Sequence, residues 1–161
     1  MSWFQLFLSA ALLSCISFLV RSSPPASGAH LSDEFAVYMI TAPSAQVAKD
    51  LSHGLVLGRL AACVNIVPSV QSVYIWDGKV QTENEHMLVV KSRRSLLADL
   101  QYFLKSHHPY NVPELIELPI AGGGGSYLSF LNANTADPGQ YLSSGAASSS
   151  PAAKTQSPPT L

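Results

Sequence analysis

Two long runs of β-forming residues flank the dipeptide Asp77-Gly78, and they constrain the fold more than any other feature of this chain. Asp-Gly supplies the left-handed backbone positions of a two-residue hairpin turn. The run before it is ACVNIVPSVQSVYIW and the run after it is VQTENEHMLVVKS, which predicts a long antiparallel hairpin with a polar tip. Because Pro68 cannot donate a hydrogen bond to a neighbouring strand, we expect a bulge or a sheet edge there.

A strand and a helix are predicted before this hairpin. The stretch EFAVYMITA is rich in β-branched and aromatic residues, as is typical of a strand covered on both sides. Pro43 and Ser44 end that strand and open a helix in which apolar residues recur every four positions from Val47 to Leu55. Gly58 is expected to stop this helix in a left-handed conformation.

A second helix and a last strand are predicted after the hairpin. In SLLADLQYFLKSHH we expect Ser95 to act as the N-cap, and Pro109 ends the helix near His108 because the residue before a proline disfavours helical geometry. One face of this helix is predicted to carry Leu96, Leu100, Phe103, Leu104 and His107. A strand ELIELPIA, a flexible glycine connector and a short helix YLSFLNAN complete the domain.

The order strand, helix, strand, strand, helix, strand indicates an α+β fold of the split βαβ, ferredoxin-like type. Such a fold is a four-stranded antiparallel sheet with both long helices on one side. The other side needs cover, since Val73, Ile75, Val89 and Val90 would leave apolar sheet exposed in a monomer. We therefore expect an oligomer, and a symmetric ring is the simplest closed solution.

The two ends of the chain differ in composition from residues 32–135, the predicted domain. Residues 1–29 carry an apolar run without a charge before Arg21, and are predicted to be a signal peptide cleaved after Ala29 or a retained signal anchor. Either one places the protein in the secretory pathway, secreted or membrane-associated, and a mitochondrial presequence is the alternative. Residues 136–161 are rich in Ser, Ala and Pro, which predicts a disordered tail.

Charge and cysteine content exclude several classes of protein. Nine basic residues face ten acidic ones, so a broad cationic surface for nucleic acid is not expected. Of the two cysteines, Cys15 lies in the N-terminal segment and Cys63 is alone in the domain, so no intrachain disulfide is predicted there. We find no nucleophile with its base, no phosphate loop and no zinc-ligand spacing, which predicts a protein that is not an enzyme and needs no organic cofactor.

Several blocks, in this order and spacing, resemble the CutA family of divalent-cation tolerance proteins: ITAP, GRLAACVNIVP, VYIWDGKVQTENEHMLVVKS, HHPYNVPELIELPI and YLSFLNAN. The resemblance covers residues 35–134 and implies a ferredoxin-like fold assembled into a homotrimer. It also implies binding of copper, Cu(II), or another divalent cation. Animal members of the family have been linked to membrane anchoring of acetylcholinesterase, so a secretory-pathway scaffold for such a partner is the alternative. Small-ligand sensing in clefts between subunits is a third possibility.

The resemblance further implies which residues hold copper. In bacterial relatives a first-strand cysteine acts with paired histidines, which correspond here to His107 and His108, but Ile40 stands at the cysteine position. Adjacent helical residues point about 100° apart, so a site would need help from Cys63, Glu114 or another subunit. In the alternative interpretation His107 packs on the core and a protonated His108 interacts with the helix C-terminus.

Aromatic residues are the other candidates for contacts. Trp76 and Tyr74, at the hairpin, are predicted to be interface aromatics, with ligand stacking as the alternative. Tyr110 is predicted to line a cleft between subunits or to fill the end of the helix. Glu83 and Glu85 alternate with polar residues and are expected on a solvated strand face.

Overall fold

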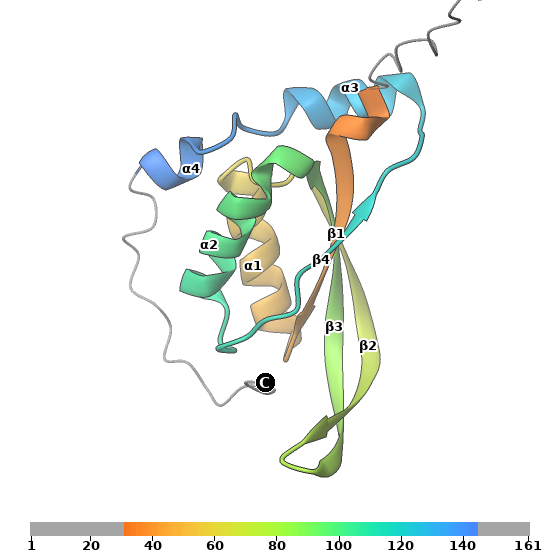
Figure 1. Cartoon of the computed structure of the whole chain (residues 1–161), viewed down its shortest axis with the longest axis vertical. Coiled ribbons are helices and arrows are strands. Elements are labelled where there is room, and N and C mark those ends of the chain that lie inside the picture. The colour runs from red at the N-terminus through yellow and green to blue at the C-terminus, as the bar shows by residue number, and fades with distance from the viewer. Residues whose placement is uncertain (1–30, 145–161) are drawn as a thin grey trace, which may run out of the picture.

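The computed structural model describes residues 31–144 as a four-stranded antiparallel sheet in the order β2-β3-β1-β4, with two long helices on one side of it. Figure 1 shows α1 and α2 together on that side, while the opposite face of the sheet carries no helix. The predicted fold class, element order and helix placement are confirmed. The elements are η2 (Leu31–Glu34), β1 (Phe35–Ala42), α1 (Ala45–Leu57), β2 (Cys63–Trp76), β3 (Lys79–Arg93), η3 (Arg94–Leu96), α2 (Leu97–His107), β4 (Ile116–Pro119), α3 (Gly125–Ala133) and α4 (Gln140–Ser143).

The core lies between the sheet and the two long helices. Strand β1 is central, and its residues Tyr38 and Ile40 pair with Val90 and Leu88 of β3 beneath the helices. All four side chains are buried. Helix α1 begins where Ser44 accepts a hydrogen bond from the Val47 amide at 3.3 Å, as an N-cap side chain does.

The predicted hairpin is confirmed. Residues pair from Cys63 with Lys91 to Trp76 with Lys79, and the turn places Asp77 and Gly78 at φ 45° and 73°. The register shifts between Val67 and Val70, so the strand bulges beside Pro68 as expected. In Figure 1 the distal part of the hairpin projects as an arm beyond α1 and α2.

Two predicted helix boundaries are wrong in detail. Gly58 is right-handed at φ −75°, and the left-handed residue after α1 is Arg59 at φ 55°. Gly58 instead makes room for a neighbour, because a Cβ there would lie 3.3 Å from the ring of Tyr141. Ser95 is not an N-cap: it lies within the 3-10 turn η3, and the residue that precedes α2 is Leu96, which makes no side-chain cap.

The folded part continues beyond the boundary predicted at residue 135. Helix α4 buries Tyr141 against the core, and the carboxylate of Asp99 accepts hydrogen bonds from the amides of Gly139 at 3.0 Å and Leu142 at 3.3 Å. Asp99 itself is buried, so it anchors this C-terminal segment to α2. The predictions for residues 1–29 and for the tail beyond 144 lie outside the described residues. No helix within residues 31–144 is long and apolar enough to cross a membrane.

The pairing register shows which residues lie on the face of the sheet without helices, which we call the open face. Directly paired residues share a face, so Val89 lies on the open face with Met39, while its neighbour Val90 lies beneath the helices. The prediction that Val90 is exposed is therefore wrong. Ile75 and Val80 pair on the helix side of the arm but lie past the helices, and each is 71% exposed.

Candidate functional site

His108 closes α2 and is almost completely buried, with 1% of its surface exposed. Its Nε2 donates to the carbonyl of Thr41 at 2.8 Å, and its Nδ1 accepts from the amide of Tyr110 at 3.0 Å. These partners fix the neutral tautomer with the proton on Nε2, because Nδ1 must keep its lone pair to accept. Neither nitrogen is left to ligate an ion while this arrangement persists, and the alternative with a protonated His108 does not fit either.

His107 points to a different part of the molecule. Its ring stacks on Phe103 at a centroid distance of 4.3 Å, and its Nδ1 donates to the Phe103 carbonyl at 2.9 Å. The backbone becomes extended at His108, with φ −79° and ψ 137°, so the two rings diverge where the helix ends. The expectation that adjacent histidines cannot easily share one ion is supported by this geometry, and so is the placement of His107 on the Phe103 side of the helix.

Cys63 does not join the histidines within one chain. It begins β2 opposite Lys91, which in turn pairs with Val37 of β1. Thr41, the partner of His108, lies four residues further along β1, which is about 13 Å in a strand. Over residues 32–144, no group of three or more His, Cys, Asp or Glu side chains is arranged to hold a metal ion. The predicted set His107, His108 and Cys63 therefore does not form a shared site in one protomer.

Beside His108 the structure instead reveals a buried carboxylate. Glu85, expected on a solvated face, is only 5% exposed. Its Oε2 accepts from the Ser72 hydroxyl at 2.7 Å and its Oε1 accepts from the Tyr110 hydroxyl at 3.1 Å. Burial, followed by the charge of Glu85 and this hydrogen bond, raises the pKa of Tyr110, so its hydroxyl remains a donor at neutral pH. Tyr110 thus connects α2's end to β3, and its ring lies 5.0 Å from that of His108.

Glu114 brings a second carboxylate to this region. Burial is the largest cause that raises the pKa of Glu114, and the negative charge of Glu85 raises it further, against a hydrogen bond with the Thr41 side chain that lowers it. Thr41 pairs with Met87, and Glu85 lies two residues from Met87 in β3, so both Thr41 and Glu85 lie on the open face. Two partly desolvated carboxylates therefore act on each other on a surface that no helix covers.

No basic side chain neutralises these carboxylates within the described residues. The ion pairs formed over residues 31–144 are Arg93 with Glu34 and Arg94 with Glu117, and both involve other acids. Burial of a carboxylate near a second one costs free energy that an added cation would reduce. We call Glu85, Glu114, Tyr110 and Ser72 the carboxylate cluster.

The other predicted aromatic residues lie further along the same face of the arm. Tyr74 and Trp76 are half-buried and share the open face with Glu85 and Ser72. Burial raises the pKa of Tyr74, and the charges of Glu83 and Glu85 raise it further. Their predicted role as interface residues concerns contacts between copies of the chain and stays a prediction.

A polar atom on the helix side of the same strand also lacks a partner. Nδ1 of His86 is buried without a hydrogen bond among the described residues, although the residue as a whole is only half-buried. His86 pairs with Ala42, the last residue of β1. It lies on the opposite face from Glu85, because adjacent strand residues alternate between faces.

The chain is similar to known proteins in sequence and in fold. Residues 36–134 match the family described as CutA1 divalent ion tolerance protein. The chain is 46% identical to protein CutA, chloroplastic, of Arabidopsis thaliana over 99 residues, which are 62% of this chain and 54% of that protein. It is 37% identical to the protein CutA homolog of Xenopus laevis over 128 residues, which are 80% of this chain and 83% of that protein.

The fold also matches solved structures. The crystal structure of CutA1 from Oryza sativa superposes with a TM-score of 0.65 at 44% identity, covering 67% of this chain and 99% of that one. The match with the Arabidopsis thaliana protein spans only about half of that relative's length. The matched region includes β1 to α3 but ends before α4.

Proposed function

The chain belongs to the CutA1 divalent ion tolerance protein family, and from this premise we propose that it acts as a homotrimer that binds a divalent cation at the carboxylate cluster. One observation carries the proposal: Glu85 and Glu114 lie together, partly desolvated, with no basic partner in the described part of the chain. The proposed role is binding and not catalysis, in keeping with the family description, which names ion tolerance and no reaction.

The ligand chemistry favours one class of ion. Carboxylate and phenolic oxygens suit the harder divalent cations such as Mn²⁺, whereas Cu(II) is well served by imidazole. Copper bound by His107 and His108 would require His108 to give up its bonds to Thr41 and Tyr110. We therefore propose Glu85 and Glu114 as the principal ligands and treat copper at the paired histidines as the competing hypothesis.

Assembly is part of the proposal because one chain supplies too few ligands. Two carboxylates and a phenol, each giving one oxygen, leave at least half of the roughly six to eight positions around an ion to water or to a neighbouring copy. The open face also carries exposed apolar residues, among them Val67, Ile116 and Leu118, which association of copies would cover. Three copies is the number that the family resemblance implies, and three identical contacts can close into a ring.

The test is calorimetric titration of the full chain with MnCl₂ and, separately, CuCl₂. We expect the double variant Glu85→Gln, Glu114→Gln to lose at least about 10-fold in Mn²⁺ affinity, or about 1.4 kcal/mol. Glu83→Gln is the matched control, because Glu83 is exposed and lies two residues from Glu85 on the same strand face. It should leave the affinity unchanged.

The same titration separates the competing hypothesis. If copper affinity is lost in a His107→Ala, His108→Ala variant but not when the two glutamates are replaced, the ion is held by the histidines and the carboxylate proposal is wrong. Sedimentation equilibrium at each step reports whether the trimer persists, so loss of the site can be distinguished from loss of the assembly.

A second candidate function is a secretory-pathway scaffold that assists anchoring or assembly of a membrane partner such as acetylcholinesterase. The observation that favours it is the uncharged apolar run from Trp3 to Val20, followed by small residues before His30. N-terminal sequencing of protein purified from cells distinguishes cleavage near His30 from retention. A chain that reaches the mitochondrion, or that binds its partner only when loaded with ion, would contradict this candidate.

A further inference from the structure

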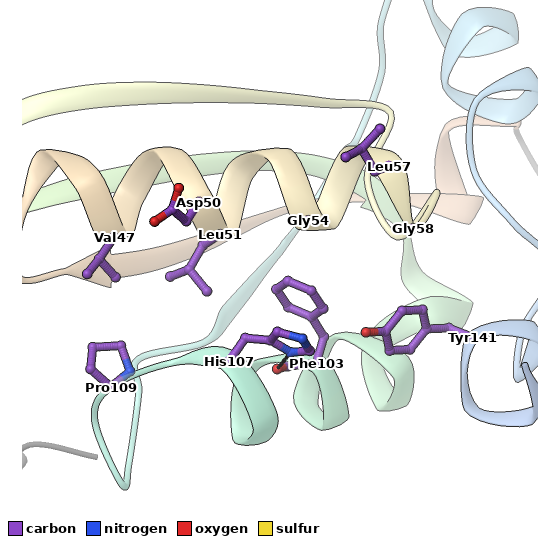
Figure 2. A pocket seen from close by; sticks show the side chains of 10 residues that line it. All are labelled: Val47, Asp50, Leu51, Gly54, Leu57, Gly58, Phe103, His107, Pro109 and Tyr141. Atoms are coloured by element: carbon purple, nitrogen blue, oxygen red, sulfur yellow. Dashed lines mark hydrogen bonds between the residues drawn. The ribbon is translucent and has the colours of Figure 1, made fainter. Parts of the chain in front are cut away.

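A cavity of about 510 Å³ lies between α1 and α2, on the side of the molecule opposite the open face. Figure 2 shows Val47 and Leu51 directed from α1 toward α2, with Phe103, His107 and Tyr141 approaching from the other side. Its volume falls within the range of about 300 to 1,000 Å³ that is usual for small-molecule sites. The ion-binding proposal uses none of these five residues.

Two glycines on one face of α1 bring the aromatic wall close to the helix. A Cβ at Gly54 would lie 2.7 Å from Cζ of Phe103, and one at Gly58 would lie 3.3 Å from the ring of Tyr141. Glycine inside a helix costs about 0.5 to 1 kcal/mol relative to alanine, so Gly54 is unfavourable for α1 alone, whereas Gly58 is the residue that caps the helix. The close packing of the two rings supplies a physical reason for both residues.

The aromatic wall has a defined geometry. Phe103 stacks on His107 with the ring planes 13° apart, and it meets Tyr141 edge to face at 6.0 Å. Tyr141 belongs to α4, which Asp99 holds through the amides of Gly139 and Leu142. The wall is therefore anchored at both ends, and a flat ligand ring placed against it gains offset or edge contacts.

Charge at the rim selects the ligand. The lining contains one carboxylate, Asp50, which is exposed and holds a hydrogen bond from Gln46 at 2.8 Å, and it contains no lysine or arginine. A ligand cation at the rim would gain from Asp50 and from the π-faces of the nearby rings. An anion would meet the same carboxylate, and the imidazole of His107 in the lining already bonds the Phe103 carbonyl through Nδ1.

We propose that this cavity binds an aromatic ammonium compound, with the ring between α1 and the Phe103–Tyr141 wall and the ammonium group at Asp50. The apolar lining excludes strongly hydrated cations such as Mn²⁺ from the interior, because an ion without polar ligands would pay its full desolvation cost. The site is thus distinct from the carboxylate cluster. Tyr141 also lies beyond the family-matched residues 36–134.

The experiment titrates the purified full chain with 1-naphthylmethylamine and, as the matched anion, 1-naphthylacetate, followed by calorimetry. We expect the amine to bind and the acetate to bind at least about 5-fold more weakly. Asp50→Asn should reduce amine affinity by up to about 5-fold, the effect of an exposed ion pair. Asp77→Asn is the control, because Asp77 is an exposed acid in the turn between β2 and β3, and Figure 1 shows the end of this hairpin projecting beyond α1 and α2.

Two further variants test the position of the ligand. Leu57 lines the mouth and is largely exposed, so Leu57→Lys should fold normally and repel the amine. Tyr141→Ala removes one wall and should weaken the amine by about 10-fold, consistent with loss of an aromatic contact. Absence of amine binding at millimolar concentration, equal affinity for the acetate, or amine affinity unchanged in both variants would each overturn the proposal.

Discussion

The hydrogen bond from Tyr110 to Glu85 gives the sharpest test of the carboxylate cluster. Tyr110→Phe removes the hydroxyl that lies 3.1 Å from Glu85 Oε1 but keeps the ring that packs beside His108. A hydrogen bond to a charged group contributes about 1.5 to 3 kcal/mol, and loss of one donor leaves a buried carboxylate with the Ser72 hydroxyl as its recorded donor. We therefore expect the free energy of unfolding to fall by about 2 kcal/mol.

Urea unfolding at fixed protomer concentration measures this change, since association would otherwise alter the apparent stability. Tyr102→Phe is the matched control, because Tyr102 is exposed on α2 and its loss of a hydroxyl should cost less than about 0.5 kcal/mol. Equal losses in the two variants would refute the reasoning. A double-mutant cycle with Ser72→Ala adds a stricter criterion: because both donors serve one carboxylate, the combined loss should depart from additivity by at least about 0.5 kcal/mol.

Three further outcomes are expected. Burial raises the pKa of Glu114, so its contribution to stability is present below the ordinary carboxyl value of about 4.3 and is lost as the pH rises through the folded-state value. Glu114→Gln should therefore stabilise the ion-free protein increasingly toward neutral pH, as followed by urea unfolding, and a pH-independent difference would contradict this. Gly54→Ala should lower stability by about 1 to 3 kcal/mol because its Cβ meets Phe103, and Phe103→Leu in the same chain should recover part of the loss in thermal unfolding. Leu118→Asp on the open face should weaken self-association in sedimentation equilibrium, whereas Val112→Asp, at an exposed loop position, should leave it unchanged.

The sheet and the hairpin could be predicted because their signals are local. Asp77-Gly78 requires only two neighbouring residues in left-handed geometry, and Pro68 restricts its strand to a bulge or a sheet edge, both of which are found. The helix ends were harder to predict from the sequence. Arg59, and not Gly58, adopts the left-handed conformation, and Gly58 instead makes room for Tyr141 from a distant part of the chain.

The C-terminal boundary was missed for a similar reason. Composition after residue 135 indicates disorder, but a single aromatic residue, Tyr141, finds a place against α1 and α2. The matching signal is Asp99, a buried acid in the first turn of α2. Its partners, the amides of Gly139 and Leu142, lie some forty residues away in sequence, so a search by composition or period could not connect them.

Only part of the candidate site could be predicted from the sequence. The paired histidines were correctly expected to diverge, but His108 turned out to be the buried one because the chain leaves the helix there and turns its ring toward Thr41. The polar neighbours of Glu85 predict that it lies on a solvated strand face. The two-residue period of a strand places Glu85 on the same face as Met87 and Val89, which pair with residues of the central strand β1. This pattern could have indicated burial.

The turn after α2 contributes residues to both proposed sites, which differ in their ligand chemistry. His107 and Pro109 line the apolar cavity between the helices, while His108 and Tyr110 hold the backbone beside the carboxylates. Alternate residues of one short segment thus serve opposite sides of the sheet. Because an ion needs oxygen ligands and the cavity offers an apolar wall, the cavity rejects a divalent ion on desolvation alone. Substitutions at Glu85 and Tyr141 should therefore separate the two binding activities within the same folded chain.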